Sequence, residues 1–488
     1  MLFNSIEFLL FFPIVTILYF LLPHRFRWFH LLAASCIFYM YFIPIYILIL
    51  FFTIIIDYIA GIMIENAAGK RRKLFLVMSI VANVGVLSFF KYYNFFINNV
   101  DSFFHLVNAG TRFPLLKIIL PIGLSFHTFQ AMSYTIEVYR GNQKAERHFG
   151  IYALYVMFYP QLVAGPIERP QNLLHQFHER HYVDYDNVIG GLRLILWGMI
   201  KKVVIADRLS PVVDSFYNNP YNNSGIGLAI ATVLFAFEIF CDFSGYSDIA
   251  IGAARVMGFK LMTNFNKPYH SRSVSEFWKR WHISLSTWFK DYLYISLGGN
   301  RVSIPRMYFN LFFVFLVSGF WHGANWTFLI WGALHGFYLI FALYTREGRK
   351  KLNNFLGLSK IHWLNNFIDV TTTFVLVTFA WLFFRAKNVK DAFYIVKRIF
   401  NIPFELLQIY HTKKIGFLNL PGLKNTILPC FALIICLELA HIIQVRYRLQ
   451  ETFNKKPIVL RWALYYLGIA ALFFLGVYEN RQFIYFQF

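Results

Sequence analysis

The chain has 488 residues, of which 58 % are hydrophobic, 20 % aromatic and only 14 % charged, and its mean hydropathy is +0.51. So little polar surface cannot cover a soluble globule, and the sequence contains many apolar runs of about 20 residues, the length that spans a bilayer. The composition predicts an all-α polytopic membrane protein. It excludes a soluble enzyme, and the unbroken apolar runs argue against an outer-membrane barrel.

The formal net charge of +22 does not indicate a nucleic-acid partner. Cytoplasmic loops of membrane proteins are enriched in Lys and Arg, and some of the excess is suited to attracting an anionic head group or substrate. The four cysteines are scattered through apolar segments, with neither metal-ligand spacing nor a disulfide pattern. We predict membrane lipid as a partner and no bound metal.

In chain order, thirteen apolar segments are candidate spans. They cover residues 3–22, 28–44, 46–64, 74–90, 115–136, 149–165, 187–206, 225–254, 306–321, 325–345, 366–385, 426–445 and 459–478. Some are expected to be re-entrant, so the prediction is about 10 to 13 membrane helices. No linker or repeat interrupts them, which favours one membrane domain over residues 1–488.

Basic clusters predict the orientation of these spans. Residues 2–22 lack the features of a cleaved signal and are expected to be a retained first span. "HRFRW" at 24–28 and "GKRRK" at 69–73 mark the cytoplasmic side, with Lys201–Lys202 and residues 346–351 as later markers. The N-terminus is then expected outside.

Residues 255–305 form a long basic and aromatic interruption. Trp278, Trp281, Leu285 and Trp288 recur at helical spacing, and Lys279, Arg280 and Lys290 occupy the other face. Two compatible interpretations stay open: an amphipathic helix at the membrane interface, or a helix that lines the entrance to a site.

Three polar clusters lie where polar groups are costly. Glu238 and Asp242 share a helix face before "SGYSD", and either pair with Lys or Arg structurally or line a polar site. His282 follows Trp281 and is either a hydrogen-bonded structural residue or a donor-binding group. His322 stands between Trp321 and Gly323, and its imidazole is suited to general-base work.

Three further histidines lie close together in one short stretch of the sequence. "HQFHERH" at 175–181 has a His-x-x-His-x-x-His spacing, but it lies in a polar loop with no nearby cysteine, and a metal is the weaker interpretation.

Together these stretches resemble the membrane-bound O-acyltransferase family, in its alginate O-acetyltransferase-like bacterial branch. The resemblance runs nearly end to end. It rests on "MLFNSIEFLLFFP", "FFKYYNFF" at 89–96, "LPIGLSFHTFQAMSYTIEVYRG" at 120–141, "FYPQLVAGPIERP" at 158–170, "WGMIKKVVIADRL" at 197–209, "CDFSGYSDIAIG" at 241–252, "FWKRWHISLSTWFKDYLYISLGGNR" at 277–301, "SGFWHGANWTFLIWGALHG" at 318–336, "WLFFRA" at 381–386 and "FIYFQF" at the end.

The resemblance implies a ring of tilted helices around a central tunnel, with a family-like core at about residues 120–345. It places the family's histidine in the Trp-His-Gly context on His322 and a second functional position on His282. His322 is then the expected base. Asn325, Trp321, Trp326 and Asp242 are expected to support it, and Lys279, Arg280, Trp281 and Lys290 to bind the donor.

The resemblance implies acetyl transfer from a cytoplasmic thioester, acetyl-CoA or an acyl-carrier thioester, to an alginate-like polysaccharide or to peptidoglycan. An extracytoplasmic SGNH-type acetyltransferase is the expected partner, the bacterial inner membrane is the expected location, and no cofactor is expected to be tightly bound. Two alternatives are D-alanyl transfer to teichoic acid from a carrier-protein thioester, and a transporter or channel with a histidine relay.

Overall fold

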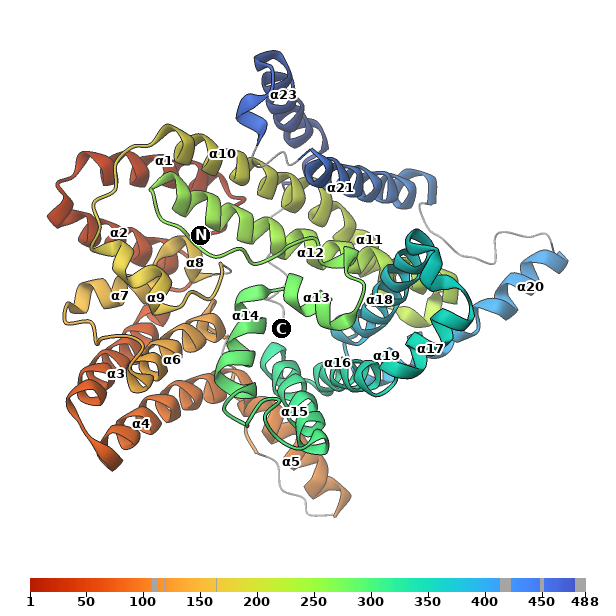
Figure 1. Cartoon of the computed structure of the whole chain (residues 1–488), viewed down its shortest axis with the longest axis horizontal. Coiled ribbons are helices and arrows are strands. Elements are labelled where there is room, and N and C mark those ends of the chain that lie inside the picture. The colour runs from red at the N-terminus through yellow and green to blue at the C-terminus, as the bar shows by residue number, and fades with distance from the viewer. Residues whose placement is uncertain (108–112, 118–119, 164, 413–422, 448–451, 479–488) are drawn as a thin grey trace. The chain divides into compact units, whose positions relative to one another are not determined.

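The computed structural model describes residues 1–107, 113–117, 120–163, 165–412, 423–447 and 452–478 (Figure 1). Within these ranges the chain is helical and contains no β-strand. Part of the predicted 115–136 span and the whole "FIYFQF" segment lie outside the described residues.

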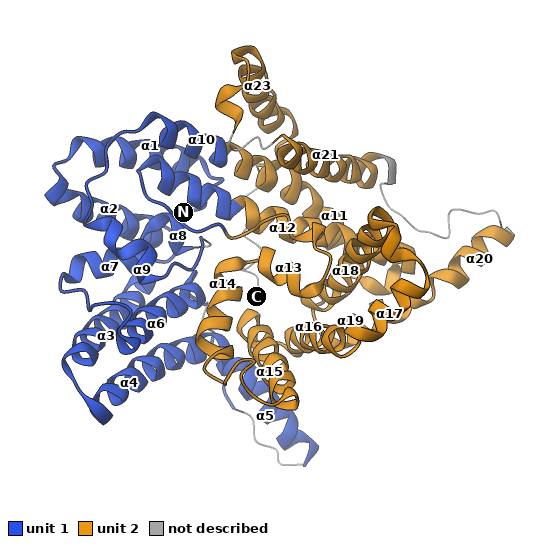
Figure 2. Ribbon diagram, in the orientation of Figure 1, with its two compact units in different colours: residues 1–195, 246–263 blue, residues 196–245, 264–488 orange. Residues whose placement is uncertain are grey.

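The described residues divide into two compact units, coloured separately in Figure 2. Unit 1 comprises residues 1–195 and 246–263, and unit 2 comprises residues 196–245 and 264–488. The long helix α12 (Gly225–Val256) contributes residues to both. The single-domain organisation expected from the sequence stays a prediction.

Most helices of unit 1 overlap the predicted apolar runs of the N-terminal half, although residues 93–106 form a helix where no span was predicted. They are α1 (Ile6–Leu21), α2 (His24–Met40), α3 (Ile47–Asn66), α4 (Gly69–Leu87), α5 (Tyr93–Leu106), α6 (Leu124–Arg140), α7 (Phe149–Met157), α8 (Tyr159–Leu162), α9 (Pro170–Leu173) and most of α10 (Tyr185–Met199). The predicted 149–165 span is wrong as one helix, because α7 ends at Met157 and the chain turns before α8.

Buried hydrogen bonds join three helices of unit 1. Asp57 of α3 accepts from the Ser79 hydroxyl at 2.6 Å and from the Asn83 amide at 2.9 Å, both on α4. Ser79 also bonds to Thr135 of α6. A buried carboxylate needs such partners, because an unsatisfied polar group in an apolar interior costs several kcal/mol.

Unit 2 contains the C-terminal helices and the expected site residues. Its elements are a π-helical segment (Ile200–Ala206), α11 (Asp207–Tyr217), the first part of α12, α13 (Val274–Arg280), α14 (Ile283–Trp288), a second π-helical segment (Phe289–Tyr294), α15 (Ile304–His322), α16 (Trp326–Tyr344), α17 (Arg346–Phe355), α18 (His362–Arg385), α19 (Val389–Phe400), α20 (Ile402–Thr412), α21 (Leu428–Arg446) and α23 (Ile458–Leu475).

Helices α15 and α16 form a tight antiparallel hairpin through glycines. A Cβ added to Gly319 would meet the Phe328 carbonyl oxygen at 2.3 Å, and one added to Gly332 would meet that of Phe315 at the same distance. Only glycine allows backbones to approach so closely, as at small-residue contacts between membrane helices. The hairpin fixes the position of the residues at its turn, which include His322.

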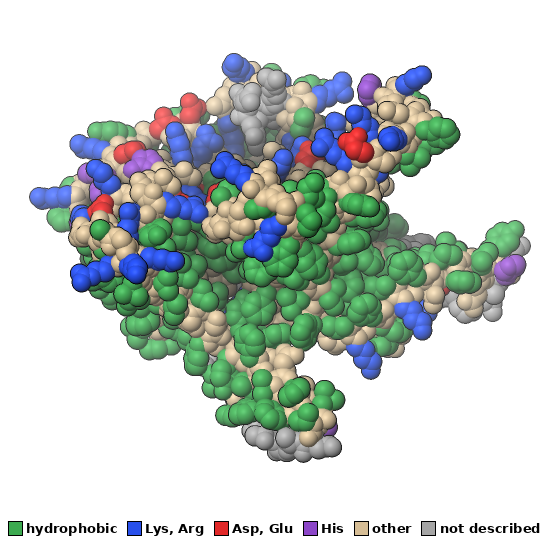
Figure 3. Space-filling view, turned by 60° about the horizontal axis from the view of Figure 1, so that its bottom comes forward, with side chains coloured by type: hydrophobic (Ala, Val, Ile, Leu, Met, Phe, Trp, Pro, Cys, Tyr) green, Lys and Arg blue, Asp and Glu red, His purple; other side chains and the backbone are tan. Residues whose placement is uncertain are grey.

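Eight helices in the described ranges are long and apolar enough to cross a membrane, and α1 is a shorter apolar helix. Large apolar side chains are exposed along them, including Phe474, which is 85 % exposed. Figure 3 shows hydrophobic side chains over much of the visible face, with Lys and Arg gathered toward its upper border. This surface suits a lipid environment. The count of 10 to 13 membrane helices stays a prediction.

Candidate active site

His322 is the last residue of α15 and is buried, with 3 % of its surface exposed. The helix ends there because Gly323 is extended, which turns the chain toward α16. A Cβ on Gly323 would lie 2.1 Å from a ring carbon of Phe328, so the turn has no room for a side chain. The local sequence thus places an imidazole at a helix end inside the protein.

Aromatic rings surround the His322 imidazole. The ring centroids of Trp321, Trp331 and Phe384 lie 5.0, 4.9 and 5.4 Å from its own, each in an edge-on arrangement. The sequence identified Trp321 but missed Trp331 and Phe384. Phe384 belongs to the "WLFFRA" segment, which the sequence marked only by its resemblance to a family.

Asn325 has a structural position at the start of α16. Its side-chain oxygen accepts from the Thr327 N–H at 3.1 Å as a helix N-cap, and its amide donates to the Lys387 carbonyl at 3.0 Å. Trp326, the other expected supporting residue here, is 52 % exposed. Asn325 therefore fixes the turn after His322, whereas about half of the Trp326 surface is exposed.

His282 lies at a break between two short helices, so the expected continuous amphipathic helix is wrong. Helix α13 ends at Arg280, Trp281 is extended, and His282 has a left-handed backbone with a φ of 42° before α14 begins. Left-handed φ is costly for a residue with a Cβ and is concentrated at functional sites. The sequence suggested one helix because the tryptophans keep helical spacing on both sides of the break.

Asn264 determines which nitrogen of His282 carries the proton. The Asn264 side-chain oxygen accepts from the backbone N–H of Ser284 at 3.2 Å and lies 3.2 Å from Nδ1 of His282. Because that oxygen can only accept, Nδ1 is the protonated nitrogen and Nε2 carries the lone pair. The ring is fully buried and meets Phe243 edge-on at 4.6 Å.

Burial lowers the pKa of His282 to about 3, so the folded protein holds it neutral. The unfolded chain takes up a proton near pH 6.5, so this group's stability contribution is complete above that pH and falls as the pH drops toward 3. Between pH 7 and pH 5 the loss is about 2 kcal/mol. We expect His282→Gln to reduce the fall in melting temperature over that interval. An unchanged pH slope would contradict a neutral buried His282.

One aromatic cluster joins the two histidines. From His322 the contact to Trp331 leads to Trp381, at a centroid distance of 5.7 Å, and Trp381 meets Trp281 at 4.9 Å. Trp281 directly precedes His282. The indole N–H groups of Trp331 and Trp381 are buried and make no hydrogen bond to any described residue. Two donors are therefore available in the cluster that connects the histidines.

Asp242 is one partner in a buried ion cluster. The Lys202 ammonium lies 2.6 Å from an Asp242 oxygen and 2.8 Å from an Asp207 oxygen, with all three side chains at least 96 % buried. Asp242 thus pairs with a basic residue, and its expected supporting role at the site stays a prediction. Lys201 is also buried and donates to Ser244 at 2.9 Å, so both lysines lie in the protein interior, and their use as a marker of the cytoplasmic side stays a prediction.

The expected donor-binding residues differ in exposure. Lys279 and Lys290 are exposed, while Arg280 pairs with Glu276 at 2.6 Å one helical turn away. Trp281 is 1 % exposed and packs in the aromatic cluster. Lys279 and Lys290 are thus accessible to an anionic ligand, and Trp281 is placed beside the histidines.

The three histidines of the 175–181 loop do not converge. His178 pairs with Glu146 at 2.8 Å, His175 approaches Glu179 at 3.7 Å, and His181 bonds to the Gln176 carbonyl. Each side chain has its own partner, so within the described part of the chain they form no shared ligand set.

Comparisons with known proteins identify the family to which the chain is similar. The model of the membrane-bound O-acyltransferase family matches residues 148–384. The chain is 37 % identical over 462 residues to the "Probable alginate O-acetylase AlgI" of Pseudomonas aeruginosa, covering 93 % of this chain and 83 % of that protein.

Two further relatives are named for acyl transfer to other cell-envelope polymers. Identity to the peptidoglycan O-acetyltransferase of Helicobacter pylori is 38 % over 395 residues, 75 % of this chain and 72 % of that protein. Identity to the teichoic acid D-alanyltransferase of Bacillus subtilis is 25 % over 287 residues, 56 % of this chain and 71 % of that protein. The matched family region contains both His282 and His322.

Proposed function

Because the chain belongs to the membrane-bound O-acyltransferase family, we propose that it transfers acetyl groups from a thioester to hydroxyls of an exported polysaccharide. It is a multi-pass membrane enzyme, which decides against the transporter alternative. Acetyl transfer is favoured over D-alanyl transfer because the relatives named O-acetylase or O-acetyltransferase are 37 to 40 % identical over at least 75 % of the chain. The D-alanyltransferase of Bacillus subtilis is 25 % identical over 56 % of it.

The proposed reaction breaks the acyl–sulfur bond of the donor and forms an oxygen ester. His322 removes the proton from the attacking hydroxyl and returns it to the departing thiolate. Negative charge develops on the carbonyl oxygen during the attack, and donors aimed at it lower the barrier. The indole N–H groups of Trp331 and Trp381 supply such donors. Their position in the cluster that joins His322 to His282 is the observation that carries the proposal.

His282 and the exposed lysines contribute to substrate binding in this proposal. With Nδ1 protonated toward Asn264, the Nε2 lone pair of His282 accepts a hydrogen bond from the donor or from the acceptor hydroxyl. Lys279 and Lys290 attract the phosphates of acetyl-CoA. The proposal includes the expected ring of about 10 to 13 membrane and re-entrant helices around a tunnel.

The acceptor side and the location complete the proposal. The donor enters from the cytoplasmic face of the bacterial inner membrane, and the acetyl group reaches an alginate-like glycan or peptidoglycan on the other side. The final transfer to the glycan is made by this chain or by an extracytoplasmic SGNH-type acetyltransferase that receives the acetyl group from it.

Donor identity is tested in membrane vesicles that contain the full chain and its natural glycan. We expect radiolabelled acetyl-CoA to yield base-labile label in the glycan, and D-alanine on a carrier protein to yield none. The measurement is label released by mild alkali, with vesicles lacking the chain as the control. Transfer of D-alanine but not acetyl would overturn the assignment.

A further inference from the structure

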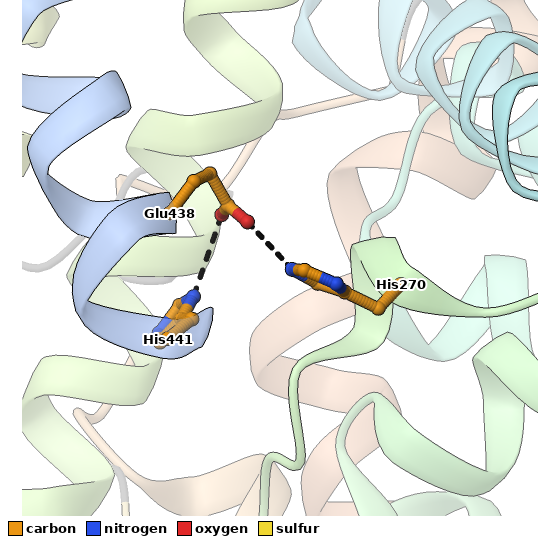
Figure 4. Close-up of side chains that lie close together, drawn as sticks. All are labelled: His270, Glu438 and His441. Carbon is orange, nitrogen blue, oxygen red and sulfur yellow. Dashed lines mark hydrogen bonds and ion pairs between the residues drawn. The ribbon is translucent and has the colours of Figure 1, made fainter. Parts of the chain in front are cut away.

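Three residues outside the proposed acyltransfer chemistry converge in unit 2. Glu438 and His441 are three apart on α21 and share a helix face, and His270 lies in the turn after Lys267, far away in sequence (Figure 4). Figure 4 shows the Glu438 carboxylate between the two imidazoles. One nitrogen of each histidine and a carboxylate oxygen all lie within 4.8 Å of one another.

Both imidazoles approach the carboxylate of Glu438. Nε2 of His270 is 2.6 Å from one oxygen of Glu438, and Nδ1 of His441 is 3.4 Å from the other. His441 is 4 % exposed, and its Nδ1 makes no hydrogen bond to any described residue. A buried imidazole nitrogen directed at a carboxylate without a hydrogen bond is an incomplete arrangement.

We propose that His270, Glu438 and His441 bind a divalent metal ion, with Zn²⁺ the best match. Two imidazoles and one carboxylate form a known protein ligand set for zinc, with bonds of about 2.0–2.2 Å and a fourth position for water. Ligand atoms around a tetrahedral ion are then about 3.3–3.5 Å apart, so the His441–Glu438 distance already fits, and Nε2 of His270 and its Glu438 oxygen move apart from 2.6 Å when the ion enters.

The surroundings favour a structural metal. His441 packs edge-on against Phe240 at a centroid distance of 5.9 Å, and His270 and Glu438 are partly exposed, which provides a path for the ion. The ion fastens α21 to the turn at His270, twelve residues before His282. The site therefore braces the segment that carries the buried His282.

The proposal is tested on the full chain purified in detergent through a tag without histidines. After removal of metal with a chelator, we expect Zn²⁺ titration to give about one tightly bound ion per chain and to raise the melting temperature. His441→Ala and Glu438→Gln are each expected to retain less than about a tenth of that zinc. Metal content is measured by mass spectrometry.

His178→Ala is the matched control, because it removes a histidine that is paired with Glu146 at 2.8 Å and belongs to no three-ligand cluster among the described residues. We expect its zinc content to equal that of the unmodified chain. The zinc-dependent rise in melting temperature is measured on the unmodified chain, so misfolding of a variant cannot produce or hide it. Absence of a zinc-dependent rise in melting temperature, or equal zinc in His178→Ala and folded His270→Ala, would overturn the site.

Discussion

Replacing His322 with alanine is expected to lower acetyl transfer by about 10²- to 10⁴-fold, the usual effect of removing a general base. The imidazole is the titratable group at the end of α15, and the rings of Trp321, Trp331 and Phe384 enclose it. Neither a hydroxyl nor water at that position accepts a proton as readily at neutral pH. The measurement is the initial rate of acetyl transfer from acetyl-CoA in vesicles with matched amounts of the protein.

Two comparisons separate chemistry from folding. His362→Ala removes an exposed histidine at the start of α18 and is expected to keep full activity. His322→Gln retains a polar side chain of similar length and is expected to keep the melting temperature near that of the unmodified protein while losing activity. If His322→Ala or a stable His322→Gln transferred acetyl at the normal rate, His322 would not be the base.

Replacing Lys202 with methionine is expected to destabilise the protein by about 3–5 kcal/mol, the cost of leaving buried charges without their partner. Lys202 lies between Asp207 and Asp242, both within 2.8 Å, and the three side chains are almost completely buried. Without the ammonium, two carboxylates face each other in an apolar interior. The free energy of unfolding in detergent, measured by chemical denaturation, reports the loss.

A triple variant that removes all three charges shows whether the instability of Lys202→Met comes from unpaired charges or from lost packing. Lys202→Met together with Asp207→Asn and Asp242→Asn is expected to recover much of the lost stability, because no buried charge remains. Lys390→Met changes an exposed lysine and is expected to alter stability by less than about 0.5 kcal/mol. A Lys202→Met variant as stable as Lys390→Met would show that the ion cluster is not needed for folding.

The positions of the long helices were predictable from local sequence. Apolar runs around α3, α12, α16 and α18 mark helices within a few residues of where they form, since length and hydropathy act locally. The break at His282 was not predictable in this way. Tryptophans keep helical spacing across it, and the left-handed conformation depends on contacts with Asn264, eighteen residues earlier in the chain.

The interaction partners of the polar groups were likewise set by tertiary contacts and could not be read from the sequence. The sequence marked Asp242 as costly in a span but left its role open, and it used Lys202 only as a marker of the cytoplasmic side. The structure pairs the two residues. Likewise, the histidines that are close in sequence, in the 175–181 loop, take separate partners, whereas nitrogens of His270 and His441, 171 residues apart, lie within 4.8 Å of each other.

By itself the sequence determined that this is an all-helical membrane protein, the approximate limits of its apolar helices and, through resemblance, the acyltransferase family, and it predicted His322 as the base. Composition and periodicity act along the chain and survive without tertiary contacts. Only the tertiary structure decided that Trp331, Trp381 and Trp281 connect His322 with the neighbourhood of His282, that Asn325 caps a helix, and that Lys202 is buried. These features depend on side chains from separate helices, and their distances are set by packing rather than by spacing along the chain.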